Sequence, residues 1–174
     1  MQAEYTIRTA VIADSEAIAA VHIQSWRETY PGIMPQQRLD SMNLERSTKH
    51  WQANISGAFT VLVAEVEGRI VGFASGGDNH ENQDCETGIG NVCDCELGAL
   101  YLLKEFHGRG FGKALFIRFV ELMKQEKRRT MIVWVAEKNL STGFYAAMGG
   151  ELADRKILMV CEVPISVLGF KYVF

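Results

Sequence analysis

The sequence lacks several features that mark whole classes of protein. Its 174 residues include no stretch that approaches the roughly 18 to 20 consecutive apolar residues of a membrane-spanning helix. The N-terminal segment has no basic stretch followed by an apolar one, so no signal peptide is predicted. Positive charge is not in excess, since the formal net charge is -3, which argues against a surface for nucleic acid. We therefore expect a cytoplasmic protein without membrane or nucleic-acid partners.

Cysteine is scarce, and its spacing argues against a metal site. Three of the four cysteines lie close together, Cys85, Cys93 and Cys95, but no C-x2-C pair of the kind that zinc sites use is present. Cys93 and Cys95 alternate along a predicted strand, so both side chains point to one face, which favours a buried pair of thiols. In a cytoplasmic protein these thiols are expected to be reduced, and we predict no metal ligands.

What the sequence does contain is typical of one globular domain. Hydrophobic residues make up 48% and charged residues 22% of the chain, and its length suffices for a sizeable core. No repeat, low-complexity segment or linker divides it, so residues 1–174 are predicted to form a single domain. The sequence leaves open whether that domain is a monomer or a homodimer.

Strand-like and helix-like segments follow one another along the chain, which predicts an α/β fold. Strands are expected over residues 5–10, 59–66, 69–75, 92–103, 130–136, 156–163 and 167–174, with Glu67-Gly68 as the turn of a hairpin. Helices are expected over residues 14–26, 35–42, 44–56, 110–127 and 141–148, the first with Asp14 as its N-cap. Residues 76–91 are polar and contain glycine, so a long exposed loop is expected there.

The most informative stretch is residues 96–113, ELGALYLLKEFHGRGFGK. An apolar strand leads through a short polar step to three glycines, Gly108, Gly110 and Gly112, and a predicted helix follows. Glycine lets the backbone approach a ligand closely, and the first amides of a helix have no partner within the helix. A strand, a glycine-rich turn and a helix N-terminus together predict a site for phosphate or pyrophosphate.

The usual nucleotide motifs do not fit this turn. A dinucleotide fold requires G-x-G-x-x-G after its first strand, whereas the spacing here is G-x-G-x-G in the middle of the chain. A P-loop requires Ser or Thr after its lysine, and Lys113 is followed by Ala114. Another phosphate-bearing cofactor is therefore expected.

Two motifs carry a resemblance to a known family. His107-Gly-Arg-Gly110-Phe-Gly112 is similar to the Gln/Arg-x-x-Gly-x-Gly/Ala motif of the GNAT (GCN5-related) N-acetyltransferases, except at its first position. Asn139 followed by Phe144-Tyr145 and Gly149 resembles that family's N-x-x-x-x-F-Y-x-x-x-G segment. Residues 25–32 and 167–172 resemble a subgroup that includes polyamine acetyltransferases. The resemblance implies a mixed, mostly antiparallel sheet with helices on both faces and a splayed central strand pair that holds acetyl-coenzyme A (acetyl-CoA).

The resemblance also implies which residues hold the cofactor. The turn amides would bind the pyrophosphate, with further attraction from the cations Arg109 and Lys113. The residues of this predicted phosphate site are Gly108, Arg109, Gly110, Phe111, Gly112 and Lys113. The strand end Leu100, Tyr101 and Leu102 would pair with the pantetheine amides, and the Leu102 amide is the candidate to polarise the thioester. Asn139 would contact the pantetheine arm or fix the loop before the helix. His107 replaces the family's Gln or Arg: if the family's contact there is through the backbone, the change costs little, and if it is through the side chain, neutral imidazole would hold phosphate more weakly than Arg near pH 7.

Roles in catalysis follow from the same resemblance. Tyr145 would donate a proton to the leaving thiolate, and Glu96 or an ordered water chain would take the proton of the amine. Simple alternation places Asp94 on the strand face of Glu96, unless a bulge changes it. Aromatic residues would line the acceptor pocket, namely His22, Trp26 and Tyr30, although core packing accounts nearly as well for the first two.

The function implied is acetyl transfer from acetyl-CoA to a primary amine of a small molecule. Direct attack in a ternary complex is expected, because no cysteine or serine has an evident activating partner. Two alternatives stay open: an acetyltransferase for proteins or peptides, and a non-catalytic acyl-CoA sensor.

Overall fold

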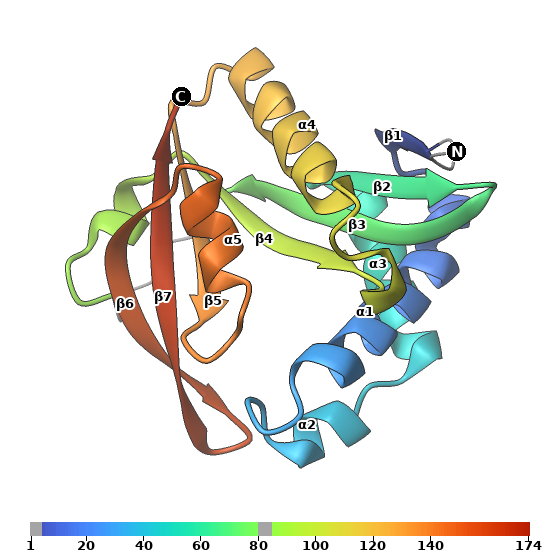
Figure 1. The fold of residues 1–174 in the computed structure, drawn as a ribbon, viewed down its shortest axis with the longest axis horizontal. Coiled ribbons are helices and arrows are strands. Elements are labelled where there is room, and N and C mark those ends of the chain that lie inside the picture. Colours follow the sequence, from blue (N-terminus) through green and yellow to red (C-terminus); the bar gives the residue numbers. More distant parts are fainter. Residues whose placement is uncertain (1–4, 80–84) are drawn as a thin grey trace.

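The computed structural model describes residues 5–79 and 85–174, and its centre is a seven-stranded sheet in the order β1-β2-β3-β4-β5-β7-β6 (Figure 1). Every neighbouring pair is antiparallel except β4 and β5, which are parallel. The strands are β1 (Tyr5–Thr9), β2 (Thr60–Val66), β3 (Arg69–Asp78), β4 (Cys95–Leu102), β5 (Thr130–Ala136), β6 (Glu151–Val160) and β7 (Val163–Val173). The predicted fold class, a mixed and mostly antiparallel sheet, is confirmed.

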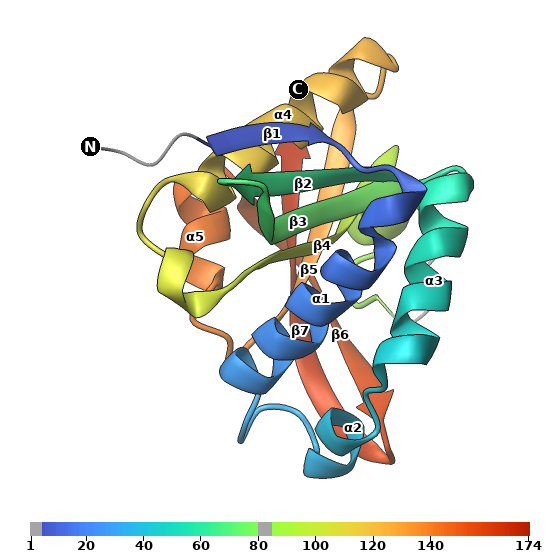
Figure 2. The ribbon, with the colours of Figure 1, turned by 90° about the vertical axis from the view of Figure 1, so that its right-hand side faces the viewer.

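Helices cover both faces of the sheet, as predicted (Figures 1 and 2). They are α1 (Ser15–Thr29), α2 (Gln36–Asp40), α3 (Leu44–Ser56), α4 (Phe111–Gln125) and α5 (Thr142–Ala147). Figure 2 shows α1 and α3 side by side over one face, while α4 and α5 lie on the other. One core of apolar side chains fills the α4 side, and a second packs beneath α1 and α3. No helix in the described part of the chain is long and apolar enough to cross a membrane.

Several predicted boundaries shift. The hairpin turn is confirmed, since Glu67 and Gly68 have φ of 49° and 79° between β2 and β3. Strand β3 continues to Asp78, so the predicted loop begins later; its residues 80–84 lie outside the described part. The last two strands begin at Glu151 and Val163, earlier than expected, because they form one long hairpin.

Asp14 is the N-cap residue of α1, as predicted, but its side chain makes no capping hydrogen bond to the helix. Its carboxylate accepts bonds from the Arg8 guanidinium at 2.7 and 3.0 Å and from the Val11 amide at 2.8 Å. Arg8 also bonds Glu65 on β2, so this buried carboxylate joins the start of α1 to two strands. The Arg8 guanidinium holds the pKa of Asp14 below its usual range.

A bulge in β4 decides which side chains face which layer. The register with β3 runs Ser75↔Ala99 and then Gly76↔Leu97, so Gly98 is the extra residue. Without the bulge, Glu96 would share a face with Leu100 and Leu102. With it, Leu100 and Leu102 pack into the core on the α4 side, whereas Ala99 and Tyr101 pack under α1 and α3. Glu96 lies on the face of Ala99 and Tyr101.

The central strands part, as the family resemblance implied. Strand β4 pairs with β5 at two positions only, Cys95↔Met131 and Glu96↔Ile132. Strand β5 nevertheless stays paired with β7 along its whole length, so β4 leaves β5 after Glu96. Asp94 precedes the first residue of β4, so it does not share a strand face with Glu96. Its carboxylate accepts the Arg129 and Thr130 amides at 2.7 and 3.1 Å. The predicted splay is confirmed.

Candidate active site

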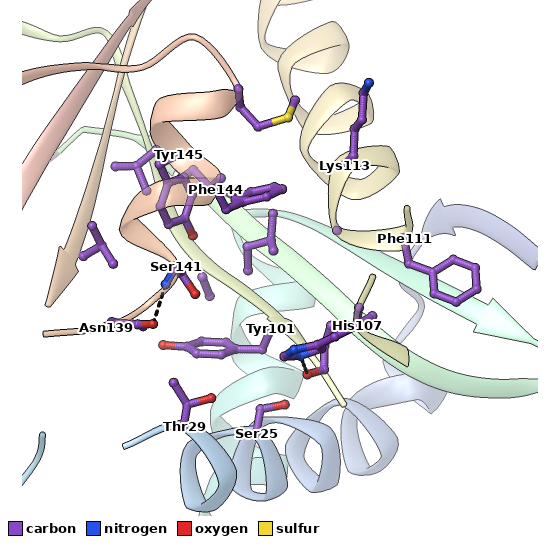
Figure 3. Close-up of a pocket in the computed structure, with 18 of the residues that line it drawn as sticks. Ser25, Thr29, Tyr101, His107, Phe111, Lys113, Asn139, Ser141, Phe144 and Tyr145 are labelled. Carbon is purple, nitrogen blue, oxygen red and sulfur yellow. Dashed lines mark hydrogen bonds between the residues drawn. The ribbon is translucent and has the colours of Figure 1, made fainter. Parts of the chain in front are cut away.

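The opening between β4 and β5 forms a cavity of about 550 Å³, called here the cofactor cleft (Figure 3). It is bounded by α1, β4, the glycine turn, α4, β5 and α5. Twelve of the predicted site residues line it, namely Tyr30, Leu100, Tyr101, Leu102, His107, Gly108, Gly110, Phe111, Gly112, Lys113, Asn139 and Tyr145. Four do not: Arg109, Glu96, His22 and Trp26.

The glycine turn is shaped to hold an anion. Gly108 and Gly110 have φ of +72° and +88°, a region that side chains other than glycine rarely adopt. Gly110 is the N-cap of α4, and its carbonyl accepts a hydrogen bond from the Ala114 amide at 2.9 Å. The amides of residues 111–113 therefore have no acceptor within the helix. Turn amides and helix dipole together favour a negative group at this end of the cleft.

The two cations of the turn are placed differently. Lys113 lines the cleft from the first turn of α4. Arg109 does not line it, and its guanidinium lies 5.3 Å from the centre of the Phe106 ring. Gly112 lies between the side chains of Leu100 and Phe144, since an added Cβ would lie 3.9 Å from each of them. Backbone amides and one lysine, rather than two cations, thus define the anion end.

The β4 edge presents backbone groups to the cleft. The Leu103 amide donates to Val71 on β3 at 2.9 Å. In an antiparallel ladder the groups of one residue point to one side and those of the next residue to the other. The amide and carbonyl of Leu102 therefore point away from β3 and into the opening. This is the orientation that an added strand-like ligand requires.

His107, the one departure from the family motif, folds back onto this edge. Its Nε2 lies 2.8 Å from the Leu102 carbonyl oxygen, so that nitrogen is the donor (Figure 3). The contact joins the glycine turn to the end of β4 through a side chain. His107 thereby holds the peptide group of Leu102 in place, a positioning role that the sequence does not reveal.

Replacing His107 by alanine should weaken coenzyme A binding about fivefold, because one hydrogen bond contributes roughly 1 kcal/mol. His107→Gln retains an N–H donor and should recover most of the loss. The dissociation constant of coenzyme A, measured by titration calorimetry for the three proteins, tests this. Equal affinity in all three would show that the contact does not shape the cleft.

A chain of polar side chains crosses the cleft from α5 to α1. Asn139 Oδ1 accepts the Ser141 amide at 2.9 Å, so it fixes the loop before α5. Its Nδ2 lies 3.5 Å from the Tyr30 hydroxyl, which in turn lies 3.3 Å from the Tyr101 hydroxyl. Of the two predicted roles for Asn139, the structure shows the loop contact.

Tyr145 extends from α5 into the cleft, opposite the residues of α1 (Figure 3). Its main-chain oxygen accepts the Tyr172 hydroxyl at 2.7 Å, which anchors the helix from behind. Burial raises the pKa of the Tyr145 hydroxyl above its ordinary value. A phenol kept neutral can donate a proton, as the predicted acid must.

Glu96, His22 and Trp26 line a second cavity of about 360 Å³ on the opposite sheet face, called here the aromatic pocket. Because of the bulge, the two cavities share Gly98, Ala99 and Tyr101. Glu96, the predicted base, and Tyr145, the predicted acid, therefore lie on opposite faces of the sheet on either side of the Gly98 bulge.

Sequence reasoning missed several lining residues. Ser25 and Thr29 line the cofactor cleft from α1, one helical turn apart, and their i, i+4 spacing was the available signal. Ser25 is 2% exposed, and its hydroxyl has no hydrogen-bond partner in the described part of the chain. Trp134 and Met148 also line the cleft, and nothing in their sequence context marked them.

Among the described residues, no cluster of three or more His, Cys, Asp or Glu side chains could hold a metal ion. Cys93 and Cys95 are buried free thiols, and burial raises the pKa of both. A parallel strand pair that opens beside a glycine turn and a helix N-terminus is typical of the class of proteins that bind an extended, phosphate-bearing ligand.

Comparison with known proteins agrees with this class. Residues 21–149 match the acetyltransferase (GNAT) family. The uncharacterized N-acetyltransferase YuaI of Bacillus subtilis is 36% identical over 165 residues, which are 94% of this chain and 90% of that protein. The chain therefore belongs to the GNAT family, and the predicted enzyme class, an acetyl-CoA-dependent acyltransferase, is confirmed.

Solved structures share the fold at low identity. The PaiA N-acetyltransferase of Thermoplasma acidophilum, solved with coenzyme A, has a TM-score of 0.72 at 19% identity and covers 98% of this chain and 99% of its own. YncA of Salmonella typhimurium, a putative acetyltransferase solved with acetyl-CoA, has a TM-score of 0.73 at 18% identity, with coverages of 98% and 94%.

Proposed function

We propose that this enzyme transfers the acetyl group of acetyl-CoA to a primary amine of a small molecule, by direct attack in a ternary complex. The observation that carries the proposal is the meeting of two cavities at the β4 bulge. One offers backbone amides for pyrophosphate and pantetheine, and the other offers a carboxylate among aromatic rings. Donor and acceptor can thus approach one point from opposite sides of the sheet.

Residues around that point can accept a proton from the amine and donate one to the leaving group. Glu96 takes a proton from the ammonium, and the free amine nitrogen bonds to the thioester carbonyl carbon. The Leu102 amide stabilises the negative charge on the carbonyl oxygen. The carbon–sulfur bond then breaks, and Tyr145 protonates the thiolate. The nitrogen, now bonded to the acetyl carbon, releases its second proton to solvent, and solvent returns a proton to the Tyr145 phenolate. The products are the acetamide and coenzyme A thiol, and no covalent intermediate with the protein is needed.

The shape of the aromatic pocket favours this function over the alternatives. A sensor without activity has no use for a carboxylate beside the thioester position. An acetyltransferase for proteins needs an open groove for the polypeptide, whereas Glu96 lies in a pocket of about 360 Å³ under α1 and α3. A small amine fits this space.

Replacing Glu96 by glutamine tests the proposal. The variant should lower kcat about 10²- to 10⁴-fold at neutral pH, the usual contribution of a general base. The deficit should shrink as the pH rises, because the amine then loses its proton without help from the enzyme. Thiol release from acetyl-CoA, followed with a primary amine from pH 6 to 10, measures both effects.

The exposed Glu16 on α1 provides the matched control. Glu16→Gln makes the same chemical change outside both cavities and should leave kcat unchanged. Full activity in Glu96→Gln, or a deficit that stays constant with pH, would mean that another group takes the proton. Absence of thiol release with every amine would refute the enzymatic function.

A further inference from the structure

Ser25 on α1 carries a hydroxyl that the fold buries without using. The side chain is 2% exposed, and its Oγ has no hydrogen-bond partner in the part of the chain that the structure describes. Other helical hydroxyls bond a nearby backbone carbonyl. Ser15 Oγ donates to the Ile12 carbonyl at 2.6 Å, at the start of the same helix. On α3, Thr48 Oγ1 donates to the Leu44 carbonyl at 2.8 Å. Since an unpaired buried hydroxyl lowers stability, Ser25 calls for another explanation.

Packing does not explain a serine at this position. Most of the other buried polar atoms without a partner in the described chain belong to rings, namely those of His22, Trp26, Trp51 and Trp134. A large ring gains stability from its buried apolar surface, which offsets one unpaired nitrogen. Serine adds only a hydroxyl to alanine, and alanine is the better helix former. The hydroxyl has a use if its partner is a ligand.

The neighbours of α1 place this hydroxyl beside the end of β4. Three residues before Ser25, the His22 ring lies 5.3 Å from the ring of Tyr101. Three residues after Ser25, the Glu28 carboxylate accepts the Lys104 amide at 3.1 Å. Residues three positions apart lie on one side of a helix, so Ser25 faces the chain between these two contacts. Ser25 lines the cofactor cleft there, and Figure 3 shows it on α1, below Tyr101 in that view.

The two sides of the cleft offer different hydrogen-bonding groups in this region. On the β4 side, the peptide groups of Leu102 point into the opening, where they can pair with an extended ligand. On the α1 side, Ser25 and Thr29 bring hydroxyls. The pantetheine arm of acetyl-CoA contains amide groups between its pyrophosphate and its thioester. An amide carbonyl oxygen has two lone pairs, so it can accept one bond from a backbone amide and another from a hydroxyl.

We propose that the Ser25 hydroxyl donates a hydrogen bond to a carbonyl oxygen of the pantetheine arm, so that the donor site extends from β4 to α1. This inference concerns the acetyl donor and does not depend on which amine is the acceptor. The hydroxyl is already buried and unpaired in the free enzyme. Its desolvation therefore costs nothing further when the ligand binds, and the whole bond contributes to affinity.

Replacing Ser25 by alanine should raise the dissociation constant of coenzyme A about tenfold, because the arm then leaves a buried carbonyl oxygen without this donor. The dissociation constant of adenosine 3′-phosphate 5′-diphosphate, which ends at the pyrophosphate and lacks the arm, should stay within about twofold. Titration calorimetry of both ligands measures these changes. The kcat at saturating acetyl-CoA should change less than about threefold, because the arm is held equally in the ground state and the transition state.

The stability of the free enzyme separates a ligand contact from a structural role. Ser25→Ala should melt at or a few degrees above the wild-type temperature, because it removes an unpaired buried hydroxyl from a helix. Ser15→Ala is the matched control, since Ser15 is 1% exposed on the same helix and lines neither cavity. It removes a bond that the fold makes, so it should melt a few degrees lower and bind both ligands normally.

Three results would overturn the proposal. A lower melting temperature of Ser25→Ala with unchanged affinity for coenzyme A would make Ser25 a structural residue. An equal loss of affinity for both ligands would place its effect at the nucleotide end of the cleft. A lower kcat with unchanged affinity for coenzyme A would place the hydroxyl at the thioester rather than on the arm.

Discussion

Gly110→Asp is expected to raise the dissociation constant of coenzyme A by at least about 100-fold. Gly110 precedes the free amides of α4 and lies at φ of +88° on the border of the cofactor cleft. A carboxylate there would lie close to the pyrophosphate. Two unit charges at 4 Å interact by about 4 kcal/mol in a partly screened site, which corresponds to roughly a thousandfold in affinity. Titration calorimetry with coenzyme A measures the loss.

Gly110→Asn separates charge from backbone strain. Asparagine has nearly the shape of aspartate and tolerates the left-handed region better than other side chains, so both variants carry a similar strain. We expect Gly110→Asn to lose affinity by about tenfold or less and to melt within a few degrees of Gly110→Asp. Equal affinity in the two variants would show that the phosphates bind elsewhere.

The glycine turn that forms the candidate anion end could be predicted from the sequence because all of its determinants are local. Glycines at alternate positions, a strand before them and a helix after them fix the turn, and the structure gives Gly108 and Gly110 the positive φ that such a turn needs. The splay of β4 from β5 came from the family resemblance rather than from these residues. Its structural cause is visible only in the pairing, which stops after Glu96.

The side of the sheet that Glu96 faces could not be predicted. Alternation alone puts Glu96 with Leu100 and Leu102, next to the pantetheine strand. The bulge at Gly98 reverses this, and it depends on register with β3, which no local pattern specifies. The proposed acceptor pocket is consequently on the α1 side, where His22 and Trp26 lie.

Asp14 holds the predicted N-cap position of α1, but the partners of its carboxylate could not be predicted for a related reason. Aspartate before a helix is a good N-cap by local rules. In the fold, the Arg8 guanidinium and the Val11 amide compete for the same carboxylate, and Arg8 is placed by the pairing of β1 with β2. Long-range ion pairs of this kind override a local preference because they satisfy a buried charge more completely.

Tyr145→Phe is expected to lower kcat by at least about 100-fold while leaving coenzyme A affinity within about twofold. The hydroxyl would act only when the thiolate leaves, so its loss removes transition-state stabilisation and little ground-state binding. Burial raises the pKa of this phenol, so its proton remains available above pH 10, where an ordinary tyrosine begins to lose it. The wild-type kcat should accordingly show no decline up to that pH. Steady-state kinetics from pH 6 to 10 test both statements.

Tyr172→Phe is the matched control, because it removes a hydroxyl that bonds the Tyr145 main-chain oxygen from behind rather than one in the cleft. Its expected cost is about 1 kcal/mol of stability, measured by urea unfolding, with kcat changed less than a few-fold. Tyr145→Phe keeps the ring contact with Phe170 and should unfold near the wild-type midpoint. If Tyr145→Phe retained full kcat, the leaving thiolate would take its proton from solvent, and Tyr145 would only pack the cleft wall.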